Sequence, residues 1–305
     1  MDDPAMGPRV AQFVAGDTPG HLEKTLDPAA PCDMWIVNWE AAITDKARAR
    51  AISREFLARS ASAMHGERVV RVNALGTPEG DRDLAELASW PPGWIDGVLF
   101  PLVESAADVR AAASRLPAGG SMAPRVHVLV ETPRAALEAA AIAAALRDTG
   151  RGGGLFAGLA DFTAALGVWE TAEDPARHFG WFLGAVVLAA RAYGLYAVGP
   201  VPPGLDQDIE GWATTWRRMG YCGVMTVHPK QSAAALRAFV PSRARLDEAL
   251  ARLAALEASG GAAVMLGNRL VEAPMCLPDL AVVREAVRAG LVESARYERF
   301  RRLFA

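Results

Sequence analysis

Eight short apolar runs, separated by alanine- and leucine-rich amphipathic stretches, constrain the fold of this 305-residue chain more than any other feature. Runs such as MWIVNWE from Met34 and RVHVLVET from Arg125 are apolar almost throughout. Continuous apolar strands are buried on both faces, which is typical of parallel sheets covered by helices. The other six runs begin at Arg9, Arg68, Gly97, Gly154, Leu195 and Gly223. Eight strand–helix alternations predict an α/β fold, a (β/α)8 TIM barrel.

The alternative architecture is a doubly wound sheet. Dinucleotide-binding sheets of that kind carry G-x-G-x-x-G directly after the first strand, and this chain has no such motif there. The stretch GRGGGLFAG precedes a strand instead of opening a helix, so we interpret its glycines as a helix stop and a turn. We predict that residues 1–258 form the barrel. Residues 259–305 are expected to form a C-terminal extension that acts as a lid or an oligomer contact.

Composition and charge argue against several classes of function. A net charge of -3 gives no general reason to expect binding of nucleic acid, whose phosphates require a basic face. The three cysteines lie far apart without C-x-x-C spacing, so neither a zinc site nor a disulfide scaffold is expected. A reducing cytoplasm is therefore the expected compartment. The N-terminus lacks a signal-peptide pattern, and no uncharged run of about 18 apolar residues predicts a membrane span.

Few polar residues stand where such a barrel carries its chemistry, at the C-terminal ends of the strands. Glu131 and Asp161 follow neighbouring strands, so we expect their carboxylates to face one position above the barrel. Two such groups suit Mg2+, which takes few protein ligands and leaves positions open for substrate oxygens. Arg71, two strands away, offers a fork for a carboxylate or a developing enolate. These three residues predict a metal-assisted site for an oxo-acid.

Each of the three also has a structural interpretation. Glu131 stands directly before a Thr-Pro pair, where a helix can begin and its dipole favours a carboxylate. Asp161 can cap the turn that follows it. Arg71 can pair with Glu40 or with Glu104. Spacing alone leaves both interpretations open.

Six segments occur in an order that is specific when they are taken together: PRVAQFVAGDTPGHLEKTL, RVVRVNALGTPEGDRDL, GVLFPLVESAADV, VETPRAALEAAAIAAA, GLFAGLADFTAALG and GYCGVMTVHPKQ. Through them the chain resembles the HpcH/HpaI aldolase and citrate lyase beta subunit family from about Arg9 to Leu291. The third segment is similar to the family's P-K-V-E-S-x-x-D-V, and the fifth is similar to its G-x-x-D-x-x-x-x-L-G.

The resemblance implies a (β/α)8 barrel, usually a homotrimer, that uses Mg2+ and often a coenzyme A thioester. Members of the family cleave or form carbon–carbon bonds between an acyl-CoA enolate and a 2-oxo-acid, and some hydrolyse the thioester. By position, Glu131 and Asp161 match the family's metal ligands, and Arg71 matches the arginine that holds the oxo-acid carboxylate or the enolate. Asn73 and His228, at the ends of the third and eighth strands, are further candidates for substrate binding; His228 also fits a structural histidine.

Four positions depart from the family pattern. The family's second strand ends D-L-E-D-[AS]-V, whereas this chain has Asn38 and Ala41 in place of the aspartates and keeps only Glu40. The lysine of P-K-V-E-S is Leu102. The aspartate of the C-terminal I-D-x-P segment, which acts from a neighbouring subunit in the malyl-CoA lyase branch, is Glu272. The second-strand motif is thus where this chain is expected to differ most from its relatives in substrate or rate.

Together these observations predict a Mg2+-dependent carbon–carbon lyase of the citryl-CoA/malyl-CoA type, which yields an acyl-CoA and a 2-oxo-acid. The catalytic candidates are Arg71, Glu272 as acid or base from a partner subunit, and Glu40, which orders metal-bound water or pairs with Arg71. Two alternatives stay open: an acyl-CoA thioesterase that uses the same metal and base with water, and a catalytically impaired paralogue that only binds ligand. The presence of Arg71, Glu131 and Asp161 argues against the paralogue.

Overall fold

The computed structural model describes residues 6–117, 120–168, 174–205 and 207–304 of the chain. The chain divides into two compact units, Met1–Arg237 and Ala238–Ala305. Helix α10 (Pro229–Phe239) runs across the boundary between them. In the described ranges, no helix combines the length and the apolar character needed to cross a membrane.

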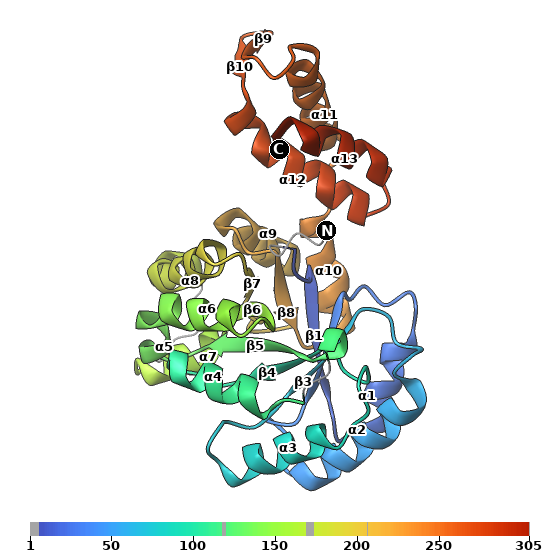
Figure 1. The fold of residues 1–305 in the computed structure, drawn as a ribbon, viewed down its shortest axis with the longest axis vertical. Coiled ribbons are helices and arrows are strands. Elements are labelled where there is room, and N and C mark those ends of the chain that lie inside the picture. The colour runs from blue at the N-terminus through green and yellow to red at the C-terminus, as the bar shows by residue number, and fades with distance from the viewer. Residues whose placement is uncertain (1–5, 118–119, 169–173, 206, 305) are drawn as a thin grey trace. The chain divides into compact units, whose positions relative to one another are not determined.

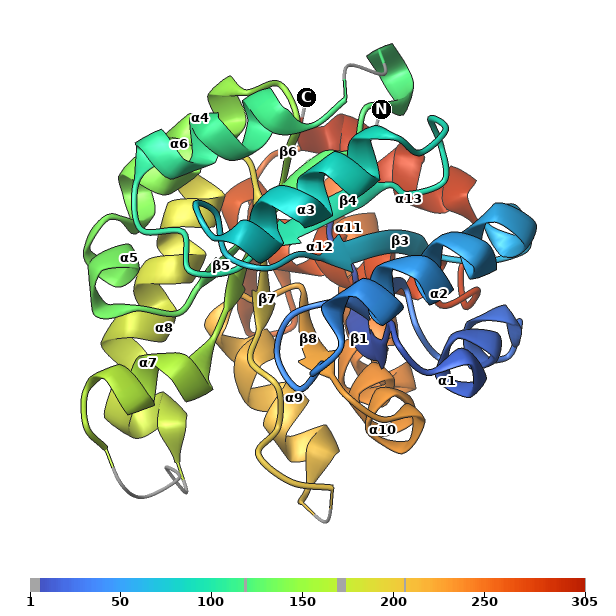
Figure 2. The ribbon, with the colours of Figure 1, turned by 90° about the horizontal axis from the view of Figure 1, so that it is seen from below.

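Eight parallel strands close into a barrel in the first unit, in the order β1 to β8, and this confirms the predicted (β/α)8 fold. Helices lie around the strands (Figures 1 and 2). The strands are β1 Val10–Ala15, β2 Met34–Asn38, β3 Glu67–Arg71, β4 Gly97–Phe100, β5 Arg125–Val130, β6 Gly152–Ala157, β7 Tyr196–Gly199 and β8 Gly223–Thr226. The helices before α10 are α1 Pro19–Glu23, α2 Lys46–Ser60, α3 Pro78–Ala88, α4 Ala106–Arg115, α5 Pro133–Leu137, α6 Ala139–Asp148, α7 Leu159–Ala165, α8 Pro175–Ala192 and α9 Ile209–Met219; the short 3-10 turns are η1 Lys24–Leu26 and η2 Gly120–Met122.

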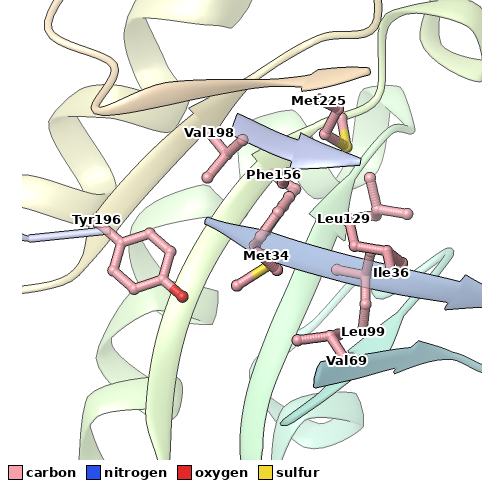
Figure 3. Packing of buried hydrophobic residues seen from close by; sticks show 10 residues of the cluster. Met34, Ile36, Val69, Leu99, Leu129, Phe156, Tyr196, Val198 and Met225 are labelled. Carbon is pink, nitrogen blue, oxygen red and sulfur yellow. The ribbon is translucent and has the colours of Figure 1, made fainter. Parts of the chain in front are cut away.

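A cluster of buried apolar side chains fills the barrel, with members from all eight strands. Figure 3 shows nine of them by name. Burying one such large side chain contributes roughly 1.5–3 kcal/mol, so this cluster accounts for much of the stability of the unit. The cluster consists of Ala11, Met34, Ile36, Val69, Leu99, Leu129, Phe156, Tyr196, Val198 and Met225.

The glycine run around the start of the sixth strand makes a turn, as the sequence predicted, and also leaves room for neighbouring rings, which the sequence did not predict. Gly150 has a φ of 65° and makes the turn after α6, as expected. The next glycines, however, already belong to β6. A Cβ on Gly153 would lie 2.2 Å from Nδ1 of His127, and a Cβ on Gly154 would lie 2.1 Å from the ring of Tyr196. The strand therefore carries glycine because two large rings occupy the space beside it.

Arginines at the N-terminal end of the barrel are engaged in stabilising contacts. The Arg68 guanidinium forms two hydrogen bonds of 2.8 Å with Asp96 and donates to the carbonyl of Ala61, the C-cap of α2. Arg151 donates to the carbonyl of Leu116, the C-cap of α4. A cavity of about 750 Å3 is lined by these two arginines and Asp96, among others. Because its arginines already have these partners, we interpret this end as structural. In barrels of this kind the chemistry lies at the opposite end.

The second unit is a helical assembly with a small hairpin. It contains α11 (Arg243–Ala258), the antiparallel strands β9 (Val264–Leu266) and β10 (Arg269–Val271), α12 (Ala273–Arg288), α13 (Ser294–Arg301) and the 3-10 turn η3 (Arg302–Phe304). Its buried core draws residues from α11, β10, α12 and α13, namely Leu246, Ala249, Leu253, Leu256, Val271, Cys276, Val283, Ala286 and Phe300.

This unit starts earlier than the extension that the sequence suggested. We expected the boundary after residue 258, but α11 contributes four side chains to the core of the second unit. A buried carboxylate adds to this packing, because Asp279 of α12 accepts hydrogen bonds of 2.7 Å from Arg245 and from Arg252, both on α11. Helix α11 therefore belongs with α12 and not with the barrel. The role of the unit as a lid or an oligomer contact stays a prediction.

Candidate active site

The predicted barrel residues stand on the C-terminal rim of the strands. Arg71 is the last residue of β3 and is in register with the last residue of β2, while Glu40 lies two positions beyond β2. Glu131 directly follows β5, and Asp161 lies in the first turn of α7, which follows β6. Four of the expected side chains thus stand on one rim, at the ends of β2, β3 and β5 and just after β6.

Glu131 is buried, with an exposed fraction of 2%. Its Oε1 accepts a hydrogen bond of 2.8 Å from the backbone N–H of Leu102, and its Oε2 lies 3.9 Å from Nη2 of Arg71. The chain passes close to it at Gly158, where a Cβ would lie 2.4 Å from the Cβ of Glu131. Only glycine fits there, so the loop from β6 to α7 closes over the glutamate and brings Asp161 toward it.

Burial raises the pKa of Glu131 to about 7, against an ordinary value of 4.5. The Arg71 charge and the Leu102 N–H lower this pKa, and the neighbouring Asp161 carboxylate raises it. Two carboxylates beside each other, one of them buried, are costly unless a proton or a cation lies between them. This donor set fits Mg2+, which is commonly held by one or two carboxylates and completes its shell with water and substrate. Among the described residues, no group of three or more His, Cys, Asp or Glu side chains forms a metal cluster.

Arg71 is buried and, besides Glu131, faces two further groups. Its Nη2 forms an ion pair of 2.8 Å with Oε2 of Glu40, and its guanidinium carbon lies 5.7 Å from the ring centre of Phe13. Its Nε is buried without a hydrogen-bond partner. A buried donor without an acceptor costs roughly 1–3 kcal/mol, and an acceptor that arrives with a ligand removes that cost. Of the two structural partners that the sequence suggested for Arg71, Glu40 forms the ion pair.

Leu102 occupies the lysine position of the family motif and has an unusual backbone. Its φ of 52° is in the left-handed region, and its side chain is 46% exposed. This conformation costs a leucine about 1–2 kcal/mol. The same conformation directs the Leu102 N–H to Glu131. The backbone at this position therefore supports the glutamate, which no side-chain motif could have shown.

Asn73 is held by the protein itself. Its Nδ2 donates to Oδ2 of Asp83 at 2.7 Å and to the carbonyl of Trp39 at 3.1 Å, and its backbone N–H also donates to Asp83. Asp83 is buried and accepts a further hydrogen bond of 2.6 Å from Arg50. Sequence reasoning missed Asp83, because it lies mid-helix in α3 and only the fold brings it to the rim. These contacts favour a structural role for Asn73 over direct substrate binding.

His228 is partly buried and lies at the start of α10. Its Nδ1 accepts a hydrogen bond of 3.1 Å from the backbone N–H of Lys230, and its carbonyl accepts from the N–H of Gln231. These bonds order the first turn of the helix. The structural alternative for His228 is thus well supported by its contacts, and its predicted role in substrate binding stays a prediction.

Glu272 belongs to the second unit. It is the N-cap residue of α12, with extended backbone, and its side chain is partly buried and forms no capping hydrogen bond. The carboxylate is therefore not committed to the helix that it precedes. This leaves it chemically able to act as an acid or a base, the role that the resemblance implied.

The family model described as HpcH/HpaI aldolase/citrate lyase matches residues 9–229, which include Arg71, Glu131 and Asp161. The chain belongs to this family. An L-malyl-CoA/beta-methylmalyl-CoA lyase from Cereibacter sphaeroides is 30% identical over 93% of this chain and 96% of its own. A (3S)-malyl-CoA thioesterase from the same organism is 30% identical over 87% of this chain and 89% of its own.

Solved structures of the family agree with the fold. CitE from Mycobacterium tuberculosis, in complex with magnesium, acetoacetate and coenzyme A, has a TM-score of 0.75 at 29% identity and covers 93% of this chain and 99% of its own. The citrate lyase beta subunit from M. tuberculosis, complexed with oxaloacetate and magnesium, has a TM-score of 0.63 at 30% identity over 79% of this chain and 100% of its own. The predicted family, barrel and enzyme class, a carbon–carbon lyase, are confirmed by these relatives.

Proposed function

We propose that this family member is a Mg2+-dependent lyase that cleaves a 3-hydroxyacyl-CoA of the malyl-CoA or citryl-CoA type into an acyl-CoA and a 2-oxo-acid. The observation that carries the proposal is the set of Glu131, Asp161 and Arg71 on one rim. It places a carboxylate pair suited to a divalent cation beside a guanidinium whose buried Nε has no acceptor. The malyl-CoA lyase relative, and the magnesium and oxo-acids bound in the CitE structures, support the same substrate class.

The chemistry divides between the chain and the cation. Glu131 and Asp161 would hold Mg2+, which supplies a Lewis acid for the oxygens of the oxo-acid. Arg71 binds the carboxylate of the same oxo-acid, and its position is fixed by Glu40 and Phe13. A base takes the proton of the 3-hydroxyl group, the carbon–carbon bond breaks, and the electron pair passes to the thioester enolate. Reprotonation of that enolate releases the acyl-CoA.

Glu272 from a partner subunit is our candidate for the proton transfers, within a homotrimer. Its side chain makes no capping bond, which supports this proposal. Native mass spectrometry should give three copies of the chain, and Glu272→Gln should reduce turnover about 100-fold or more without changing that mass. A monomer, or unchanged turnover in the variant, would remove Glu272 from the reaction.

A second reading of the same site is hydrolysis of the thioester. The (3S)-malyl-CoA thioesterase relative favours it, because that protein matches this chain at the same level of identity as the lyase. A third outcome is a protein that binds ligand without turnover. It is suggested by Asn38 and Ala41 in place of the motif aspartates and by Leu102 in place of the motif lysine.

Product analysis separates these outcomes. The protein is incubated with Mg2+ and malyl-CoA, and in parallel with Mg2+ and citryl-CoA, and the products are identified by liquid chromatography and mass spectrometry. Acetyl-CoA with glyoxylate marks a lyase, whereas malate with free coenzyme A marks a thioesterase. Activity should disappear in Glu131→Gln and persist in Glu55→Gln, which neutralises an exposed carboxylate on α2. If malyl-CoA and citryl-CoA both remain intact, the proposed activity is wrong.

A further inference from the structure

A tight turn follows β2 and carries Glu40 to the rim. The N–H of Ile43 donates to the carbonyl of Glu40 at 3.3 Å, which closes the turn. Within it, Ala42 has a φ of 65°, a left-handed conformation that alanine adopts only at a cost. Such a turn needs additional bonds to persist, and its sequence provides no glycine to lower the cost.

The side chain of Asn38, the last residue of β2, supplies two such bonds to the turn. Its Oδ1 accepts a hydrogen bond of 3.2 Å from the N–H of Glu40, and its Nδ2 donates to the carbonyl of Ala41 at 2.6 Å. One bond requires an acceptor and the other requires a donor. An amide has both, whereas an ionised carboxylate at the same position could only accept. The exchange of the motif aspartate for Asn38 therefore creates a bond that the aspartate could not make.

This turn fixes the carboxylate of Glu40. The N–H of Ala41 donates to Oε2 of Glu40, and the same oxygen forms the ion pair with Nη2 of Arg71. The preceding residue is anchored as well, because the N–H of Trp39 donates to the carbonyl of Arg71 and its indole donates to Ser53. With both sides of Glu40 held, its carboxylate faces one edge of the Arg71 guanidinium.

We propose that Asn38 is a positioning residue that acts through Glu40. By clamping the Glu40–Ala41 segment, its amide keeps Glu40 on Nη2 of Arg71, and this leaves Nε as the donor for the carboxylate of an incoming oxo-acid. The inference rests on the proposed function, since it assumes that Arg71 receives that carboxylate. It adds a specific role for a residue at which the chain departs from its family.

The test uses Asn38→Asp, which keeps the shape of the side chain, removes the donor and adds a negative charge. Two acceptors would then face each other at Ala41, so the turn should loosen. We expect faster hydrogen exchange in the segment 39–45 without ligand, and about tenfold weaker binding of oxaloacetate in calorimetry with saturating Mg2+. Thr44→Asp is the charge control, since it adds a carboxylate to the same exposed loop without touching these bonds.

A double-mutant cycle separates positioning from a general loss of structure. If Asn38 acts through Glu40, Asn38→Asp should weaken oxaloacetate binding when Glu40 is present. In the Glu40→Gln background, the same substitution should have no further effect on binding. Equal effects in both backgrounds, unchanged exchange in the segment 39–45, or an equal loss in Thr44→Asp would each overturn the inference. Failure of the wild-type protein itself to bind either oxaloacetate or glyoxylate would instead reject the proposed function.

Discussion

The ionisation of Glu131 should make the barrel less stable as pH rises. Its folded pKa of about 7 lies above the ordinary value of 4.5, chiefly because it is buried. A carboxyl group with a raised folded pKa contributes its full stabilisation below pH 4.5 and loses it as pH rises through 7. At 1.36 kcal/mol per pH unit, the loss amounts to about 3 kcal/mol. Without a bound cation, Glu131 should therefore make the free energy of unfolding of the wild type about 3 kcal/mol lower at pH 8 than at pH 4.5. Other titrating groups add their own pH dependence to this difference.

Glu131→Gln isolates this effect. The amide keeps an oxygen for the Leu102 N–H and carries no charge. The variant should be more stable than the wild type by about 3 kcal/mol at pH 8, with the difference vanishing toward pH 4.5. Saturating Mg2+ should recover a similar amount in the wild type at pH 8, about 2.7 kcal/mol at a hundredfold excess over the dissociation constant, and nothing in the variant.

Urea unfolding followed by tryptophan fluorescence is a suitable assay. All eight tryptophans precede Ala238 in the sequence, so their signal reports the barrel and not the second unit. Glu55→Gln provides the matched control, because it removes an exposed carboxylate and should leave the pH dependence as in the wild type. If Glu131→Gln follows the same pH curve as the wild type, the ionised carboxylate costs nothing and the physical argument for a cation between Glu131 and Asp161 is lost.

Three further predictions concern other parts of the molecule. Arg71→Lys should weaken oxaloacetate binding at least tenfold by calorimetry with Mg2+, because an ammonium cannot replace the guanidinium fork; unchanged affinity would contradict that role. Ala42→Gly should raise the free energy of unfolding by about 0.5–1 kcal/mol, because glycine adopts a φ of 65° without the strain that alanine has there. Ala41→Gly is the control and should lower the free energy of unfolding. Equal effects of the two substitutions would refute the reasoning. Asp279→Ala should lower the free energy of unfolding of the second unit by about 2 kcal/mol. This is less than the roughly 3–5 kcal/mol of a fully buried ion pair, because the arginines that bind Asp279 are 33% and 22% exposed. The variant should also speed hydrogen exchange in α11, and unchanged exchange would contradict this prediction.

Strand order and the rim were predictable because they follow from local patterns. Apolar runs bounded by turns mark all eight barrel strands, and β2 and β4 begin at the residues expected, Met34 and Gly97. The carboxylates of Glu131 and Asp161 follow because strand ends of a parallel barrel share one face. The strands, Glu131 and Asp161 could be placed because their positions follow from the apolar pattern of each strand and from the direction in which the chain runs through the barrel.

Other features could not be read from the sequence because they depend on contacts across the fold. The bond from Leu102 to Glu131 comes from a backbone N–H, which any residue except proline could supply. Asp83 reaches Asn73 only because α3 lies against the strand end. The hairpin of β9 and β10 has strands of three residues each, too short for a periodic signal. Tertiary packing decides such features.

The position of the bound divalent cation decides whether Glu131 and Asp161 are its ligands. A crystal of the protein soaked with Mn2+, in place of Mg2+, and oxaloacetate would show the metal by its anomalous scattering. We expect one peak bound by the carboxylates of Glu131 and Asp161, with the carboxylate of oxaloacetate on Arg71. A peak elsewhere, or none at a concentration that saturates binding in solution, would contradict the assignment of the site.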